Sequence, residues 1–285
     1  MDNLLKMKKI FDEVSHSCSK KVTNTYSTSF SMACKMLSKN IRQDIYNIYG
    51  FVRFADEIVD SFHDYDRNML FEEFNNDLER ALENKIHLNP ILNSFQITYH
   101  KYNINKELVD AFMDSMRKDL TVTKYNTQKE YENYIYGSAD VVGLMCLKVF
   151  VKGDEKKYKT LKNYAMRLGS AFQKVNFLRD YKSDLEILKR SYFPNIQLDN
   201  LDEGAKKEII SDIEMDFKNA LMGIKLLPID AKFGVFMAYR YYNQLLKKLK
   251  KTPAPEIKNA RVRVPNLKKV ELLTRSYVKY QLNLL

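Results

Sequence analysis

Three side chains with oxygen donors recur at intervals of four in the segment VNFLRDYKSDLE, residues 175–186. They are Asn176, Asp180 and Asp184. On a helix they form one stripe, each about 6 Å along the axis from the next. Arg179 and Lys182 stand among them, but the other side of the segment is apolar, so a solvated surface does not explain this order. Oxygen ligands without a nearby His or Cys cluster favour Mg²⁺, which usually completes its octahedron with water and phosphate. The stripe therefore predicts a metal-bound anion.

A second acidic pair, Asp56 and Asp60 in RFADEIVD, has the same spacing inside an apolar helical pattern. Two helices that each place acids in apolar surroundings would repel unless a cation lay between them. Arg53 and Arg179 stand next to the acids and could meet the remaining phosphate oxygens. Spacing alone is weak evidence, because it recurs without obvious purpose in Asp110/Asp114 and Asp212/Asp216. The combination predicts a diphosphate whose departure is assisted by metal.

The phosphate chemistry points to isoprenoids because the sequence has no P-loop and no Gly-rich phosphate cradle. Ionisation of an allylic diphosphate gives a carbocation, which water would quench and aromatic faces would stabilise. The chain carries 16 Phe, 19 Tyr and 12 Met, which fits a dry aromatic pocket. Such residues more often serve as core packing, so this composition supports the hypothesis without deciding it.

The elements that must position these residues are predicted to be helices. The 285 residues are 45% apolar and 29% charged, with 8 Gly and 6 Pro, a composition typical of long helices. Apolar residues at helical spacing predict helices near 3–16, 41–62, 68–84, 89–101, 106–119, 128–152, 155–188, 203–225, 229–251 and 266–283. Strand-like alternation is almost absent. We expect an all-α fold, a single domain over residues 1–285.

The net charge of +11 admits a nucleic acid, an anionic membrane, an anionic substrate or simply a solvated surface as its explanation. No nucleic-acid motif accompanies the basic residues, so we expect no nucleic-acid partner. The three cysteines lack metal-site spacing and read as reduced thiols. No signal peptide or spanning segment is evident. We expect a cytoplasmic protein, and loose docking on the inner face of the cell membrane is a hypothesis.

Five motifs, in order, resemble those of the phytoene/squalene synthase family, whose members join two prenyl diphosphates head to head. They are YSTSF (26–30), RFADEIVD (53–60), YIYGSADVVG (134–143), QKVNFLRDYKSD (173–184) with RSYFP (190–194), and ARVRVPNLKK (260–269). The resemblance covers about residues 17–280. It implies an isoprenoid synthase helical bundle with a central apolar cavity. The family often has Lys at the position of Thr28, a Gly at that of Asp140, and a Gly-Arg pair before the Tyr of RSYFP.

The resemblance implies the following roles. The Mg²⁺ ligands would be Asp56, Asp60, Asn176, Asp180 and Asp184, with the four aspartates counted as catalytic. The diphosphate would be held by Arg53, Arg179 and Arg261. The substrate sites would be lined by Tyr26, Ser27, Thr28, Ser29, Tyr49 and Gln173. The reacting allyl groups would lie near Tyr136 and Tyr242, with Tyr134 as the alternative to Tyr136.

For the reaction, the resemblance implies that two geranylgeranyl diphosphates give phytoene through a cyclopropyl diphosphate, the first committed step of carotenoid biosynthesis. Mg²⁺ is expected, with Mn²⁺ as an alternative, and no NADPH. The runner-up is a squalene or dehydrosqualene synthase that uses farnesyl diphosphate. Head-to-tail prenyltransferases and terpene cyclases typically carry DDxxD, which this chain lacks. A non-enzymatic relative would be expected to have lost the acids. The sequence leaves the oligomeric state open.

Overall fold

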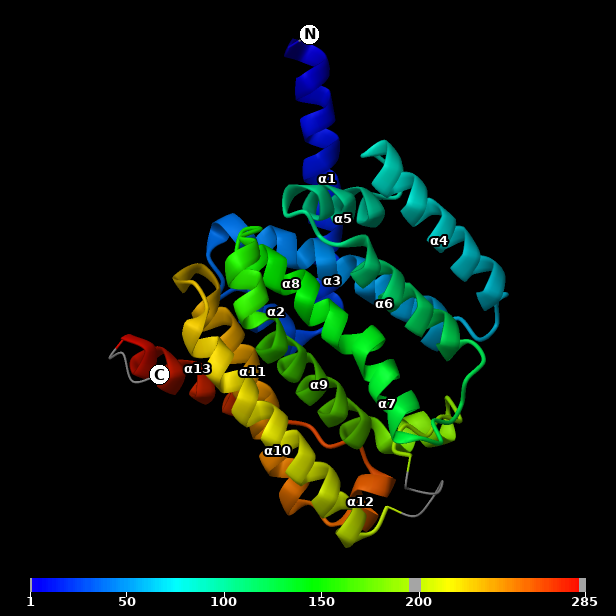
Figure 1. The fold of residues 1–285 in the computed structure, drawn as a ribbon, viewed down its shortest axis with the longest axis vertical. Coiled ribbons are helices and arrows are strands. Elements are labelled where there is room, and N and C mark those ends of the chain that lie inside the picture. Colours follow the sequence, from blue (N-terminus) through cyan, green and yellow to red (C-terminus); the bar gives the residue numbers. More distant parts are fainter. Residues whose placement is uncertain (1, 195–200, 282–285) are drawn as a thin grey trace.

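The computed structural model describes residues 2–194 and 201–281, and its regular elements there are helices (Figure 1). The predicted all-α fold is confirmed. The elements are α1 (Asp2–Tyr26), α2 (Thr28–Cys34), α3 (Lys39–Asp60), α4 (Arg67–Asn84), α5 (Pro90–Lys101), α6 (Lys106–Asp119), α7 (Gln128–Ile135), the π-helix η1 (Tyr136–Asp140), α8 (Val141–Phe150), α9 (Glu155–Glu186), α10 (Glu203–Leu226), α11 (Ile229–Lys251), α12 (Ala254–Asn259) and α13 (Asn266–Gln281).

Capping residues explain where several helices begin. The carboxylate of Asp66 accepts a hydrogen bond from the backbone N–H of Met69 at 3.0 Å and starts α4. The carboxylate of Asp154 starts α9 in the same way. At α7, Thr127 and Glu130 form a capping box, in which each side chain accepts from the other residue's backbone. These contacts satisfy N–H groups that a helix start leaves unpaired.

One local prediction is wrong. The segment 128–152 is not one helix, because the π-helix η1 interrupts it. There Gly137 packs so tightly on α6 that an added Cβ would lie 1.9 Å from Ser115 Oγ. Between the predicted helices 229–251 and 266–283 lies the additional short helix α12, whose prolines lie at its start. Proline is tolerated there because the first N–H groups of a helix have no partner within it.

Six of the α-helices and η1 enclose the predicted apolar cavity, whose volume is about 280 Å³. Its wall comes from α2, α3, η1, α8, α9, α10 and α11. Tyr49 and Gln173 lie at the end of the cavity beside the acidic motifs. The opposite end is lined by Leu37, Phe150 and Leu227, which stand where helices give way to turns. Among the described helices, none has both the length and the apolar character needed to span a bilayer.

Candidate active site

The acids of α3 are paired with an arginine of the same helix. Arg53 Nη1 donates to Asp56 Oδ2 at 2.5 Å, and Arg53 Nη2 is paired with the Glu57 carboxylate. The guanidinium carbon lies 4.5 Å from the centre of the Tyr26 ring, in cation–π contact. Because Arg53 stands three residues before Asp56 and four before Glu57, the turn of the helix itself brings the three together.

The carboxylate of Asp180 on α9 holds two arginines. Arg179 binds both of its oxygens, with Nε at 2.9 Å from Oδ1. Arg261 reaches the same Oδ1 with its Nε at 2.7 Å from the segment after α12. The structure thus brings together residues of two motifs that lie 81 positions apart in the chain. Arg261 remains half exposed, so it stands at the rim of the site.

Arg190 is a member of the site that the sequence prediction missed. Its Nη1 donates to Asp60 Oδ1 at 2.6 Å, and its Nη2 donates to the carbonyl of Asp119 at 2.6 Å. The backbone N–H of Arg190 donates to the carbonyl of Asp184, which ties it to the end of α9. Its side chain is 4% exposed. The basic residue before SYFP was visible in the sequence, but its partners lie far away along the chain.

The site has more carboxylates than cations. Six carboxylates meet four guanidiniums there: Asp56, Glu57, Asp60, Asp119, Asp180 and Asp184 against Arg53, Arg179, Arg190 and Arg261. Burial and then the charges of Asp180 and Asp60 raise the pKa of Asp184 to about 8. Burial and then Asp60 raise the pKa of Asp56 well above its usual range. This excess of negative charge favours the entry of a cation.

The residues fit a hard divalent cation held jointly with a ligand. The side-chain oxygen of Asn176 is buried and has no hydrogen-bond partner. An unpaired buried acceptor is costly, so this oxygen is suited to a metal or a donor on a ligand. No three His, Cys, Asp or Glu side chains converge on one point in residues 2–194 and 201–281. Mg²⁺ commonly takes one or two carboxylates and completes its shell with phosphate and water, which agrees with this arrangement.

Aromatic rings border the cavity beside the acids. The Phe172 and Tyr242 rings stack with centroids 4.0 Å apart, and the Phe30 and Tyr49 rings stack at 4.8 Å. Burial raises the pKa of Tyr49 to about 12, so its hydroxyl stays neutral at physiological pH. Gln173 also lines this end. A flexible apolar chain could therefore lie in the cavity with its charged head at the acids.

Comparison with known proteins shows which family the chain belongs to. The family model described as squalene/phytoene synthase matches residues 23–268. The chain belongs to the squalene/phytoene synthase family. The resemblance predicted from the five motifs is thereby confirmed, and the family is one of prenyl-transferring enzymes.

Relatives within the squalene/phytoene synthase family are distant. Phytoene synthase 1, chloroplastic, of Zea mays is 26% identical over 85% of this chain, and 4,4'-diapophytoene synthase of Staphylococcus haemolyticus is 25% identical over 67%. The matches cover 62% and 66% of those two proteins. A crystal structure of a dehydrosqualene synthase has a TM-score of 0.81 at 21% identity, covering 95% of this chain and 98% of that one. At that identity the likeness shows the fold.

The squalene/phytoene synthase motifs are not all gathered at the site. Tyr136, expected next to the reacting groups, is 39% exposed and does not line the cavity. It belongs to the π-helix η1, where the helical turn is wider than in an α-helix. Tyr134, the alternative, is buried and donates to Asp119 Oδ2 at 2.9 Å. The tyrosine of this motif that lies close to the acids is therefore Tyr134.

The YSTSF motif of this family member forms the junction of α1 and α2. The Ser27 hydroxyl caps α2 by accepting from the backbone N–H of Phe30 at 3.3 Å. Tyr26 stands over Arg53, whereas Thr28 is exposed and Ser29 half-buried. Direct contact of Thr28 and Ser29 with substrate stays a prediction.

Proposed function

We propose that this chain condenses two geranylgeranyl diphosphates head to head to form phytoene, with Mg²⁺ and without NADPH. One observation carries the proposal: an excess of carboxylates over cations lies at one end of an apolar cavity with aromatic walls. The excess of carboxylates suits a metal-bound diphosphate, and the apolar cavity suits a long hydrocarbon. We further propose that residues 1–285 act as one domain in the cytoplasm, in peripheral contact with the inner face of the membrane.

Each residue set has a defined task in this proposal. Mg²⁺, when bound, would neutralise the diphosphate and assist its departure. Its protein ligands would be drawn from Asp56, Asp60, Asn176, Asp180 and Asp184. The arginines that now pair with these acids would donate to diphosphate oxygens, since guanidinium matches phosphate as well as carboxylate.

The cavity wall would protect the allylic cation formed when the diphosphate leaves. The stacked rings of Phe172 and Tyr242 offer π faces to positive charge. Tyr49 keeps its proton and so adds no negative charge that would trap the cation. The double bond of the second substrate can then attack the cation before water does.

A farnesyl-specific reaction that gives squalene or dehydrosqualene is the second candidate. It is favoured by the names of two similar proteins, the staphylococcal diapophytoene synthase and the dehydrosqualene synthase structure. Both candidates use the same polar end and differ in the length of chain that the cavity must hold.

An extraction assay tests the proposal. Purified protein with Mg²⁺ is given geranylgeranyl or farnesyl diphosphate, with and without NADPH, and the hydrocarbons are identified by chromatography and mass. We expect phytoene from the C20 substrate without NADPH. A C30 product alone would replace phytoene synthesis by the second candidate, and no hydrocarbon from either substrate would refute both.

A further inference from the structure

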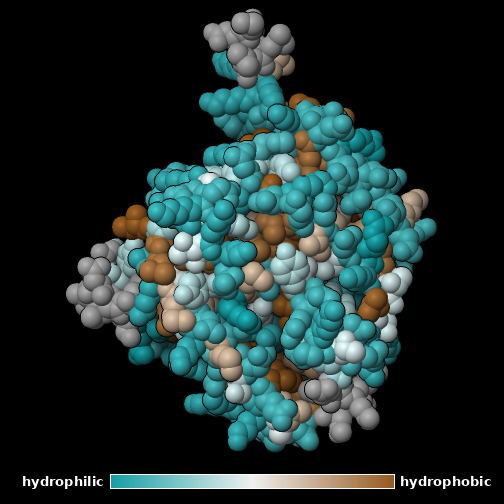
Figure 2. Space-filling view, viewed as in Figure 1, coloured by the Kyte–Doolittle hydropathy of each residue, from teal (hydrophilic) through white to brown (hydrophobic). Residues whose placement is uncertain are grey.

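The cavity end that lies away from the acids meets an exposed apolar surface. Around the turn between α10 and α11 lie three exposed apolar side chains. Met222 and Leu226, in the last turn or so of α10, are 47% and 60% exposed, and Ile229, the first residue of α11, is 79% exposed. We name these three residues the apolar turn. Figure 2 shows brown hydrophobic atoms on the left edge of the molecule, where Figure 1 places this turn.

The same turn supplies part of the cavity wall. Gly223, Ile224 and Leu227 line the cavity, and they alternate along the chain with the exposed residues of the apolar turn. A single helical end therefore presents one set of side chains to the cavity and another to the outside. The proposed function accounts for the side chains that line the cavity but not for the exposed ones.

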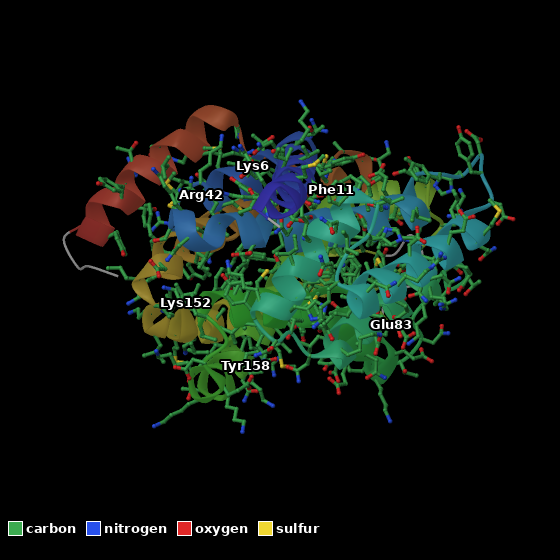
Figure 3. The ribbon with its side chains drawn as sticks, turned by 90° about the horizontal axis from the view of Figure 1, so that it is seen from above. Lys6, Phe11, Arg42, Glu83, Lys152 and Tyr158 are labelled. Atoms are coloured by element: carbon green, nitrogen blue, oxygen red, sulfur yellow. The ribbon has the colours of Figure 1, made fainter. Side chains whose placement is uncertain are left out.

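Polar contacts gather three turns at this end. The Ser38 hydroxyl donates to Asp230 Oδ1 at 2.7 Å, and its backbone N–H donates to the Asp230 carbonyl at 2.9 Å. Lys152 Nζ lies 2.6 Å from Asp230 Oδ2. Figure 3 shows Lys152 beside the gold ribbon of the α10–α11 region. The α2–α3, α8–α9 and α10–α11 turns are thus held together at the end of the cavity away from the acids.

The charge around the apolar turn is positive. Lys39 and Lys225 are exposed, Lys232 is half-buried, and Lys152 is 53% exposed. The acid at the centre of the three turns, Asp230, is already paired with Lys152. Apolar side chains flanked by lysines match the surface of a bilayer that contains anionic lipids.

We propose that the apolar turn docks this protein on an anionic lipid surface, so that the end of the cavity away from the acids faces the bilayer. The inference rests on the proposed function, because a hydrocarbon product gives the docking its purpose. Three side chains offer too little area for a stable protein interface, which needs about 800 Å² per partner. Membrane binding has no such minimum and grows with the apolar area inserted and the charge nearby.

Vesicle co-sedimentation of the full chain tests the docking. The variant Leu226→Ser/Ile229→Ser is compared with a control, Ile86→Ser/Leu88→Ser, which changes the same residue types on another exposed segment. We expect wild type and control to bind vesicles containing phosphatidylglycerol. The apolar-turn variant should bind at least tenfold more weakly, and 0.5 M salt should weaken wild type as well.

Several results would overturn the proposal. One is that wild type does not bind the anionic vesicles. A second is that the apolar-turn variant binds them as tightly as wild type. A third is that the control variant loses as much vesicle binding as the apolar-turn variant. A wild-type dimer that the apolar-turn variant dissociates, with unchanged vesicle binding, would assign the surface to a second copy of the chain instead.

A parallel assay separates docking from catalysis. With substrate dispersed in detergent, both double variants should make product at the wild-type rate, because none of the four changed residues lines the cavity. If wild type makes no hydrocarbon in detergent but binds vesicles through the apolar turn, the proposed function fails and the docking stands. If product forms but vesicle binding does not depend on the turn, the docking fails alone.

Discussion

Two aspartate pairs of identical spacing have opposite surroundings in this molecule. Asp212 and Asp216 on α10 are neutralised by Lys174 and Arg167 of α9, with Lys174 Nζ 2.7 Å from Asp216 Oδ2. Two acids meet two cations, and Lys174 and Asp216 are buried. Asp56 and Asp60 on α3 instead belong to a cluster with more acids than cations and an unpaired acceptor nearby.

Charge balance, rather than spacing, separates a structural pair from a candidate site. A closed pair lowers its own electrostatic cost and leaves nothing for a ligand to satisfy. A cluster with excess carboxylates stores unfavourable interactions, which a bound cation would relieve. Function and stability should therefore respond oppositely to mutation at the two places.

The largest expected effect is on catalysis at the acid-rich cluster. Asp180→Asn should lower kcat/KM more than about a hundredfold, because it removes a charge that would hold the metal and diphosphate. The fold should survive, since the change relieves repulsion with Asp184. Product formation under saturating Mg²⁺ measures the effect. Activity within a few-fold of wild type would refute the metal role of this residue.

The next effect is on stability at the closed pair. Asp216→Ala should lower the free energy of unfolding by about 3 kcal/mol, because it leaves buried Lys174 with only the more exposed Asp212. Urea denaturation measures the loss. Activity per folded molecule should stay near wild type. A strong loss of activity in folded protein would break the contrast between the two pairs.

The sequence predicted the helices and the acid motifs because their signals are local. The stripe from Asn176 to Asp184 follows from helical periodicity, and α9 begins at a capping aspartate. The sequence could not distinguish Asp56/Asp60 from Asp212/Asp216, since Arg190 and the cations Lys174 and Arg167 lie far away along the chain from the acids that they meet. Arg190 was missed for the same reason. Tyr136, named from the family resemblance, lies exposed on η1, and the packing of η1 against α6 is not recorded in the motif.

A smaller effect concerns a single buried acid, Asp140, beside the closed pair. Burial and then the charge of Asp216 raise the pKa of Asp140 to about 7. The Ser170 hydroxyl donates to Asp140 at 2.7 Å. An unfolded aspartate releases its proton near pH 4. The folded protein therefore binds more protons between these values, and this group's contribution to stability is lost as the pH rises through them.

Asp140→Asn should remove that loss. The amide oxygen can accept the same bond from Ser170, and it carries no charge. Relative to wild type, the variant should gain about 1–2 kcal/mol in unfolding free energy between pH 5.5 and pH 8. Urea denaturation at the two pH values measures the difference, and Ser170→Ala serves as the control that keeps the carboxyl. A difference that does not change with pH would show that Asp140 ionises freely in the folded protein.

The smallest effect is expected at a third pair of the same spacing, Asp110 and Asp114 on α6. Asp114 is exposed, and Asp110 is half exposed and pairs with Lys106 on the surface. Such ion pairs contribute about 0.3–0.5 kcal/mol, because water screens both charges. Asp110→Asn should therefore change the unfolding free energy by less than about 0.5 kcal/mol and leave product formation unchanged. A loss comparable to that of Asp216→Ala, or of activity comparable to that of Asp180→Asn, would mean that spacing rather than surroundings governs these pairs.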